Sequence, residues 1–297
     1  MRKKMMVALL TITLMMGVIF TGCTQSKNVP SNSGDKDNEP EKKPEQTQSI
    51  TINGSTSVQP LAEELASAFK DKNTNAIIDV QSGGSGVGIK SAMDGVVDIG
   101  MSSRDLKTEE KVLKEFKIAV DGIAVIVNPE NKVSDLSMEQ IKKIYTGEII
   151  DWKDVGGKAG KITVVTREEG SGTRGAFIEL TGLEAKEGDK KVDKTIASAI
   201  TQGSTGAVMT TVAGDANAIG FASFGSAKDK NNIKIISIDG ASCSEENIYS
   251  GNYKISRPFL MLTKEEPKEL SKELLDFILS PEGQEIVAKH NYLKAVK

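Results

Sequence analysis

The strongest constraint on the fold is a local pattern that occurs three times: a short β-rich run, a turn rich in Ser, Thr and Gly, and then the beginning of a helix. The three turns span residues 53–57, 81–88 and 167–174. The first residues of a helix carry backbone N–H groups without an intrahelical partner and the positive end of the helix dipole. One such turn is an ordinary N-cap, but three of them in one chain favour an anion site.

Around these turns, short apolar runs alternate with longer amphipathic stretches, which predicts an α/β fold. We expect strands at residues 49–52, 76–80, 97–100, 122–127, 161–166, 218–224 and 233–238. We expect helices at residues 58–70, around 89–93, and at 107–116, 137–145 with Ser137 as its cap, 173–180, 268–279 and 281–290.

The beginning of the chain predicts export. Arg2, Lys3 and Lys4 precede an apolar run, residues 5–20, that is too short for a comfortable membrane span. The run is followed by Thr21, Gly22 and Cys23. A small residue before a cysteine resembles the bacterial lipoprotein signal, although Phe20 stands where that signal usually has leucine. We therefore expect a signal peptide over residues 1–22 and lipidation of Cys23. The alternative is an ordinary secretory signal, and both alternatives export the chain.

Residues 24–49 are polar, charged, Gly or Pro apart from Val29, so they lack the apolar surface needed to fold. We expect the lipidated cysteine and a disordered tether over residues 23–48. Cys243, the second of the two cysteines, then has no disulfide partner and is expected to be a small buried residue.

Several functions are disfavoured. The net charge is −3 at pH 7 and the basic residues are scattered, so no nucleic-acid partner is expected. The glycine-rich residues 83–88 lack the Lys-Ser/Thr pair of a phosphate-binding P-loop and miss the dinucleotide spacing. The only histidine, His290, lies near the C-terminus, and no metal-ligand spacing is present. We expect a protein that is not an enzyme and needs no cofactor or metal.

Arg167 adds a permanent positive charge inside the third turn, with a planar fork that matches an oxyanion. The alternatives are a surface cation or a partner of Glu168. A tetrahedral oxyanion has acceptor oxygens in several directions and therefore suits several converging helix starts better than a flat ligand does.

From residue 50 to the end, the chain resembles the phosphate-binding proteins of bacterial ABC importers. The resemblance rests on residues 53–60, 84–86, 97–104 and, most specifically, 167–173. It implies a type II periplasmic-binding-protein fold, with two α/β lobes joined by hinge strands. Lobe I would comprise residues 50–127 plus 225–297, and lobe II residues 128–224.

The resemblance also implies the site. Arg167 would be a buried cation held by Glu169, and the phosphate-binding residues would be Ser55, Thr56, Ser57, Ser85, Ser103, Arg167, Glu169, Ser171, Gly172 and Thr173. Ser102 and Asp121 are weaker candidates.

One position departs from the family. Members commonly place an aspartate where this chain has Ser103, and that carboxylate accepts the proton that phosphate carries and sulfate lacks. Asp121, or Ser103 with a backbone carbonyl, could replace it; the alternative for Asp121 is a surface residue at a strand entry. Sulfate, molybdate and tungstate therefore stay open as ligands.

By resemblance, the function is an extracytoplasmic receptor that closes on inorganic phosphate by hinge motion. It would be a lipid-anchored monomer at the outer face of the cell membrane that delivers phosphate to the permease and ATPase of an ABC importer. A phosphate sensor is an alternative. A hydrolase using Ser55 or Ser85 as nucleophile would lack a base.

Overall fold

The computed structural model describes residues 48–188 and 190–295. The predicted signal peptide, Cys23 and nearly all of the predicted tether lie outside these residues. The first described residues begin strand β1 (Gln48–Gly54). Within the described part, no helix is long and apolar enough to span a membrane.

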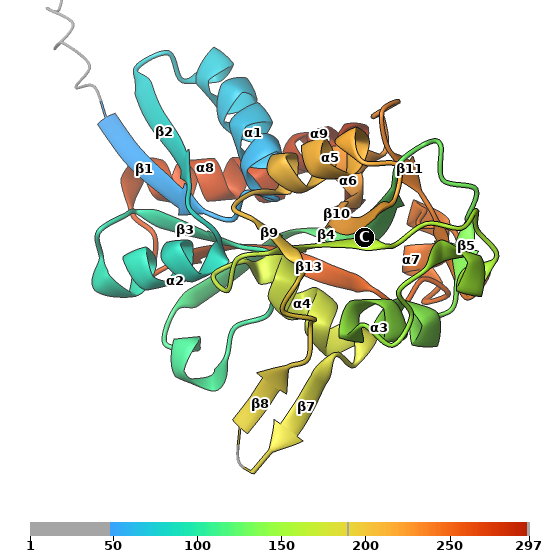
Figure 1. The fold of residues 1–297 in the computed structure, drawn as a ribbon. Coiled ribbons are helices and arrows are strands. Elements are labelled where there is room, and N and C mark those ends of the chain that lie inside the picture. Colours follow the sequence, from blue (N-terminus) through green and yellow to red (C-terminus); the bar gives the residue numbers. More distant parts are fainter. Residues whose placement is uncertain (1–47, 189, 296–297) are drawn as a thin grey trace, which may run out of the picture. The chain divides into compact units, whose positions relative to one another are not determined.

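Ten strands of the described chain form one mixed sheet (Figure 1). At one end, β1 pairs in parallel with β2 (Ala76–Ser82) and β3 (Ile99–Ser102). At the other end, β6 (Thr163–Arg167) pairs in parallel with β9 (Ile200–Gln202) and β10 (Ala218–Ser223). Two antiparallel strands lie between them, β4 (Lys114–Val127) and β13 (Ser256–Thr263). Both ends of the sheet thus carry the parallel pairing typical of α/β folds.

Four helices begin directly after parallel strands. Strand β1 leads into α1 (Gln59–Lys72), β2 into α2 (Ser85–Asp94), β6 into α4 (Gly172–Thr181) and β9 into α5 (Thr205–Gly214). Ligands of open α/β sheets bind beyond the carboxyl ends of the strands, which is where these four helices start.

The apolar side chains form two main cores. One packs β1 and β3 against α1, α8 (Glu269–Leu279) and α9 (Pro281–Lys289). The other packs β6 and β10 against α3 (Met138–Thr146), α4 and α5, and its Phe177 and Phe221 rings stack 4.1 Å apart. Strand β4 contributes Ile118 to the first core and Ile123 to the second. The fold is therefore α/β with two lobes, as predicted.

The packing differs from the predicted lobe boundaries. Ile233, Ile236 and Ile255 belong to the second core, although residues 225–297 were expected in lobe I. Strand β11 (Lys234–Ile235) pairs with the end of β4, and Ile236 N–H donates to the Val125 carbonyl. This pairing holds the segment after residue 225 against the second core.

The predicted helix at residues 107–116 is wrong. The chain forms one 3₁₀ turn (Thr108–Glu110) and then enters β4 at Lys114. Glu110 is buried, accepts the Lys107 N–H, and pairs with Arg104 at 2.7 Å. The following residues pair with β13, so long-range sheet pairing overrides the local helical pattern.

Other predicted elements are confirmed. Ser137 caps α3 by accepting the Gln140 N–H, and Cys243 is buried. The predicted strand 233–238 is interrupted into β11 and β12 (Ser237–Ile238), which pairs with β5 (Asp135–Leu136). The remaining elements are a second 3₁₀ turn (Trp152–Val155), β7 (Glu184–Glu187), β8 (Lys190–Asp193), α6 (Phe224–Ala227), α7 (Glu245–Tyr249) and β14 (Leu293–Lys294).

Candidate anion-binding site

The four helix starts and the end of β3 bring six hydroxyl groups together, each from a residue at most 3% exposed. We call them the hydroxyl cluster: Ser55, Ser57, Ser85, Ser103, Thr173 and Thr205. Ser57 Oγ lies 2.8 Å from both Thr173 Oγ1 and Thr205 Oγ1, which joins the start of α1 to those of α4 and α5. Ser55 Oγ donates to Ser103 Oγ at 2.9 Å, and Ser85 Oγ lies 3.3 Å from the same atom. Residues far apart in sequence therefore share one buried polar centre.

Local backbone geometry explains the first turn. Gly54 has φ +147°, and a Cβ at this position would lie 2.2 Å from the Met101 carbonyl oxygen. Only glycine allows β1 and β3 to approach so closely. Ser55 then accepts the N–H of Ser57 at 3.2 Å and that of Val58 at 3.4 Å, which fixes its hydroxyl beside the start of α1.

The third turn brings the second lobe against the first. A Cβ on Gly172 would lie 2.3 Å from Ser85 Oγ and 2.8 Å from Ser103 Oγ. Gly86 N–H donates to the Gly170 carbonyl at 2.9 Å across the same contact. Ser171 caps α4 by accepting the Arg174 N–H, so its side chain supports the helix and Gly172 makes the close approach.

Arg167 ends β6 beside the cluster and is 2% exposed. Its terminal nitrogens donate to Thr56 Oγ1 at 3.1 Å and to Thr205 Oγ1 at 3.2 Å. Its Nε and one terminal nitrogen also donate to the two oxygens of Glu168, at 2.8 and 2.7 Å. This bidentate geometry fixes the guanidinium plane against the hydroxyls.

The predicted pairing of Arg167 with Glu169 is wrong, because Glu168 makes both bonds. The Ser171 N–H donates to the Glu168 carbonyl at 3.0 Å, which closes a tight turn. Glu169 lies within that turn and its side chain is exposed. Glu169 therefore lies outside the hydroxyl cluster.

The two weaker candidates also lie apart from the cluster. Ser102 Oγ donates to the Arg104 carbonyl at 2.9 Å. Asp121 is 1% exposed, so it is not a surface residue, and it pairs with Arg257 at 3.1 Å. Its other oxygen accepts from the Ser223 hydroxyl and the Gly225 N–H. Burial raises the pKa of Asp121, while the charge of Arg257 and these hydrogen bonds oppose that rise.

Sequence reasoning missed Thr205 and Arg257. Residues 200–205 repeat the strand, Gly-Ser-Thr turn and helix start of the other three sites, so the same pattern would have identified Thr205. The only signal for Arg257 is a lone arginine beside the apolar run of residues 258–262. Its role depends on the register of β13 against β4.

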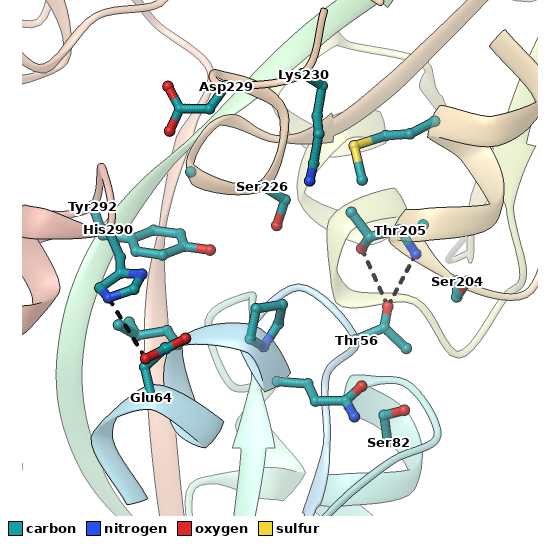
Figure 2. A pocket seen from close by; sticks show the side chains of 16 residues that line it. Thr56, Glu64, Ser82, Ser204, Thr205, Ser226, Asp229, Lys230, His290 and Tyr292 are labelled. Carbon is teal, nitrogen blue, oxygen red and sulfur yellow. Dashed lines mark hydrogen bonds and ion pairs between the residues drawn. The ribbon is translucent and has the colours of Figure 1, made fainter. Parts of the chain in front are cut away.

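Two grooves adjoin the cluster. Thr56 and Thr205 line a cavity of about 530 Å³ together with Lys230, His290 and Tyr292. Figure 2 shows the two hydrogen bonds that join Thr205 to the Thr56 hydroxyl in this groove. A second cavity, of about 780 Å³, is lined by residues that include Gly86, Ser171 and Arg257.

The chemistry of the cluster is that of an oxyanion site. Hydroxyls, helix N-termini and one buried guanidinium supply donors from several directions. His290 lies in the first groove, 3.8 Å from Glu64. Within the described residues it is therefore not positioned as a general base for Ser55 or Ser85. No group of metal-ligating side chains occurs in that part of the chain either.

Residues 40–282 match the PBP superfamily domain, the class of binding protein that this two-lobed fold and buried site define. The chain is 38% identical over 254 residues to the phosphate-binding protein PstS of Bacillus subtilis, covering 82% of this chain and 80% of that protein. The chain belongs to this family of phosphate-binding proteins.

Solved structures agree with this assignment. A protein from Clostridium perfringens, assigned as a phosphate ABC transporter substrate-binding protein and crystallised with phosphate, is 45% identical. The match covers 84% of this chain and 100% of that chain, with a TM-score of 0.79. An ABC-type phosphate transport receptor from Vibrio cholerae is 36% identical over 82% of this chain and 99% of its own, with a TM-score of 0.68.

Proposed function

We propose that this chain is an extracytoplasmic receptor that captures inorganic phosphate and delivers it to an ABC importer. The observation that carries the proposal is the convergence of four helix starts and Arg167 on one buried hydroxyl cluster. The PstS family membership supports the same ligand and the same transport partner.

Phosphate suits this cluster because its four oxygens accept hydrogen bonds in different directions. Serine and threonine hydroxyls rotate freely enough to donate to a ligand oxygen or to one another. Ser57 and Thr173, from different lobes, lie 2.8 Å apart, so one anion can be reached by both lobes. Arg167 would contribute charge, and Glu168 would hold the guanidinium in place.

The lobe boundaries are part of the proposal. Apart from Leu293, which packs with the second core, the two cores support a first lobe of residues 48–121 and 256–295 and a second lobe of residues 122–255, in place of the boundaries expected from the sequence. The chain passes between these lobes in β4 and β13. These two strands are the candidate hinge.

Membrane anchoring through Cys23 and a monomeric state also belong to the proposal. The support for anchoring is the sequence pattern of residues 1–23, which precedes the described structure. Labelled palmitate should be incorporated into the wild-type chain and lost in Cys23→Ser, whereas Cys243→Ser should keep the label. Equal labelling of both variants would contradict the anchor.

Phosphate capture is tested by calorimetry on the mature chain, after bound anion has been removed by unfolding and refolding. We expect saturable heat of binding at micromolar phosphate and no turnover of a phosphoester. A refolded chain that gives no heat with phosphate would contradict the function.

Ser103 favours a second candidate function, the binding of another tetrahedral oxyanion. Within the described residues, neither nearby carboxylate is directed at the cluster: Glu168 pairs with Arg167, and Asp121 pairs with Arg257. Without a carboxylate to repel a fully ionised anion, discrimination against sulfate should be weaker. Competition of sulfate, molybdate and tungstate with phosphate across pH distinguishes the two functions.

A further inference from the structure

The ion pair between Asp121 and Arg257 lies where the chain passes between the two cores. In β4, Ala119 belongs to the first core and Ile123 to the second, and Asp121 stands between them. Ile255, immediately before β13, belongs to the second core and Phe259 in β13 to the first, and Arg257 stands between them. The two residues are direct partners in the antiparallel register.

The pair is almost completely buried and has hydrogen-bond partners towards both cores. The two side chains are 0% and 1% exposed. Towards the second core, Asp121 Oδ1 accepts from the Ser223 hydroxyl at 3.0 Å and the Gly225 N–H at 3.3 Å. Towards the first, an Arg257 terminal nitrogen donates to the Ser103 carbonyl at 3.2 Å. One hydrogen-bonded path therefore joins the end of β10 to Ser103.

Ser103 is held from both ends of its backbone. Its N–H donates to Ser85 Oγ at 3.0 Å, and its carbonyl accepts from Arg257. Its hydroxyl lies at the centre of the first-lobe half of the cluster, bonded to Ser55 and 3.3 Å from Ser85. A shift of the Ser103 carbonyl would move this hydroxyl relative to the others.

We propose, on the basis of the function above, that Arg257 and Asp121 are positioning residues of the anion site that hold the Ser103 hydroxyl in the cluster. Arg257 donates to the Ser103 carbonyl and not to a cluster hydroxyl, so the hydrogen-bonded route from the pair to the cluster runs through Ser103. An arginine is required because only its fork reaches a carboxylate and a carbonyl together. Lysine would keep the charge opposite Asp121 but lose the second contact.

A buried ion pair by itself is weak evidence for a role in stability, because desolvation offsets the attraction. If Arg257 positions Ser103, substitutions of the two residues should have coupled effects on the free energy of phosphate binding. Residues that act through one another give non-additive effects in a double-mutant cycle, whereas independent residues give additive ones.

The test is phosphate affinity, measured by calorimetry, for the wild-type chain, Ser103→Ala, Arg257→Lys and the double variant. We expect each single variant to bind phosphate about tenfold more weakly, and Ser103→Ala to cost less than about threefold in the Arg257→Lys background. We also expect Arg257→Lys to change the ratio of phosphate to sulfate affinity. Additive effects with an unchanged ratio would overturn the proposal.

Tyr253→Phe is the matched control. Tyr253 is 1% exposed and donates to the Ile123 carbonyl of β4 at 2.7 Å, two residues from Asp121, whereas the carbonyl of Ser103 accepts from Arg257. This variant should melt at a lower temperature and bind phosphate as the wild type does. If Arg257→Lys does not fold, Asp121→Asn takes its place in the same cycle.

The two proposals can fail separately. A wild-type chain that binds neither phosphate nor sulfate contradicts the proposed function and this one together. A wild-type chain that binds phosphate, with variants that fold and bind equally well, contradicts only the positioning role.

Discussion

The two buried arginines near the cluster are surrounded by different kinds of partner. Arg167 donates to the hydroxyls of Thr56 and Thr205 and to Glu168, whose side chain is 29% exposed. Arg257 donates to the fully buried Asp121 and to a backbone carbonyl. Hydroxyls can rotate towards a ligand, whereas a backbone carbonyl within a strand-to-loop turn cannot.

This difference separates two tasks. The hydroxyls that accept from Arg167 can be replaced by the oxygens of an anion, so the region around Arg167 is suited to bind an anion. Arg257 bonds to Asp121 and to the Ser103 carbonyl, which cannot rotate towards a ligand. The region around Arg257 is therefore suited to keep the cluster residues in position. Variants of the two regions test whether binding and positioning are separate.

Arg167→Ala should weaken phosphate binding by about 2–5 kcal/mol, because it removes the cation and leaves Glu168 unpaired. Calorimetry measures the loss directly. Arg104→Ala is the control, since Arg104 pairs with Glu110 and bonds to no cluster hydroxyl. Equal affinity of Arg167→Ala and the wild type would remove Arg167 from the site.

Gly172→Ala should weaken phosphate binding by about 1–3 kcal/mol, because the new methyl group would overlap Ser85 Oγ and keep the lobes apart. Gly170→Ala is the control, since a Cβ there meets nothing within 4 Å. If both variants bind equally well, the close approach of the lobes is not needed for binding.

Glu168→Gln should weaken phosphate binding about fivefold, because the neutral amide holds the Arg167 guanidinium less firmly. Glu169→Gln should change the affinity less than about twofold, since Glu169 is exposed and does not pair with Arg167. The opposite order in a titration would restore the pairing expected from the sequence.

The half-buried pair of Arg104 and Glu110 gives the smallest effect, which is on stability. Burial tends to raise the pKa of Glu110, but hydrogen bonds from Arg104 and Lys107, with the Arg104 charge, lower it overall. Its stabilisation is therefore present above the unfolded pKa of about 4.3 and is lost as pH falls through the lower folded value.

Urea unfolding at about pH 6 and about pH 3 should show that Glu110→Gln loses about 1 kcal/mol less stability than the wild type on acidification. Phosphate affinity at neutral pH should be unchanged in this variant. Identical losses in both proteins would show that the pair contributes no pH-dependent stability.

The sequence predicted the parts of the site that depend on local chemistry. The pattern of a strand, a Ser/Thr/Gly turn and a helix start is visible in the local sequence. It identified four of the cluster residues: Ser55, Ser57, Ser85 and Thr173. Their convergence was expected from the resemblance and is present in the structure. Thr205 follows the same local pattern and was overlooked.

Other parts of the site depend on contacts that no local pattern contains. In place of the helix expected at residues 107–116, the chain forms a 3₁₀ turn and then begins β4, because the pairing of Lys114 with Thr263 and of the residues that follow extends β4 along β13. From the sequence, Asp121 could be either an acceptor for the proton of phosphate or a surface residue. In the structure it is buried and pairs with Arg257, which lies opposite it in β13.

The local sequence predicted an α/β chain whose Ser/Thr/Gly helix starts and Arg167 could bind an anion, because helix capping and side-chain charge are local properties. Only the folded chain shows that Asp121 pairs with Arg257 and that residues 233–255 pack with the second core. These outcomes depend on strand register and on the contact between lobes, which side chains far apart in the sequence fix together.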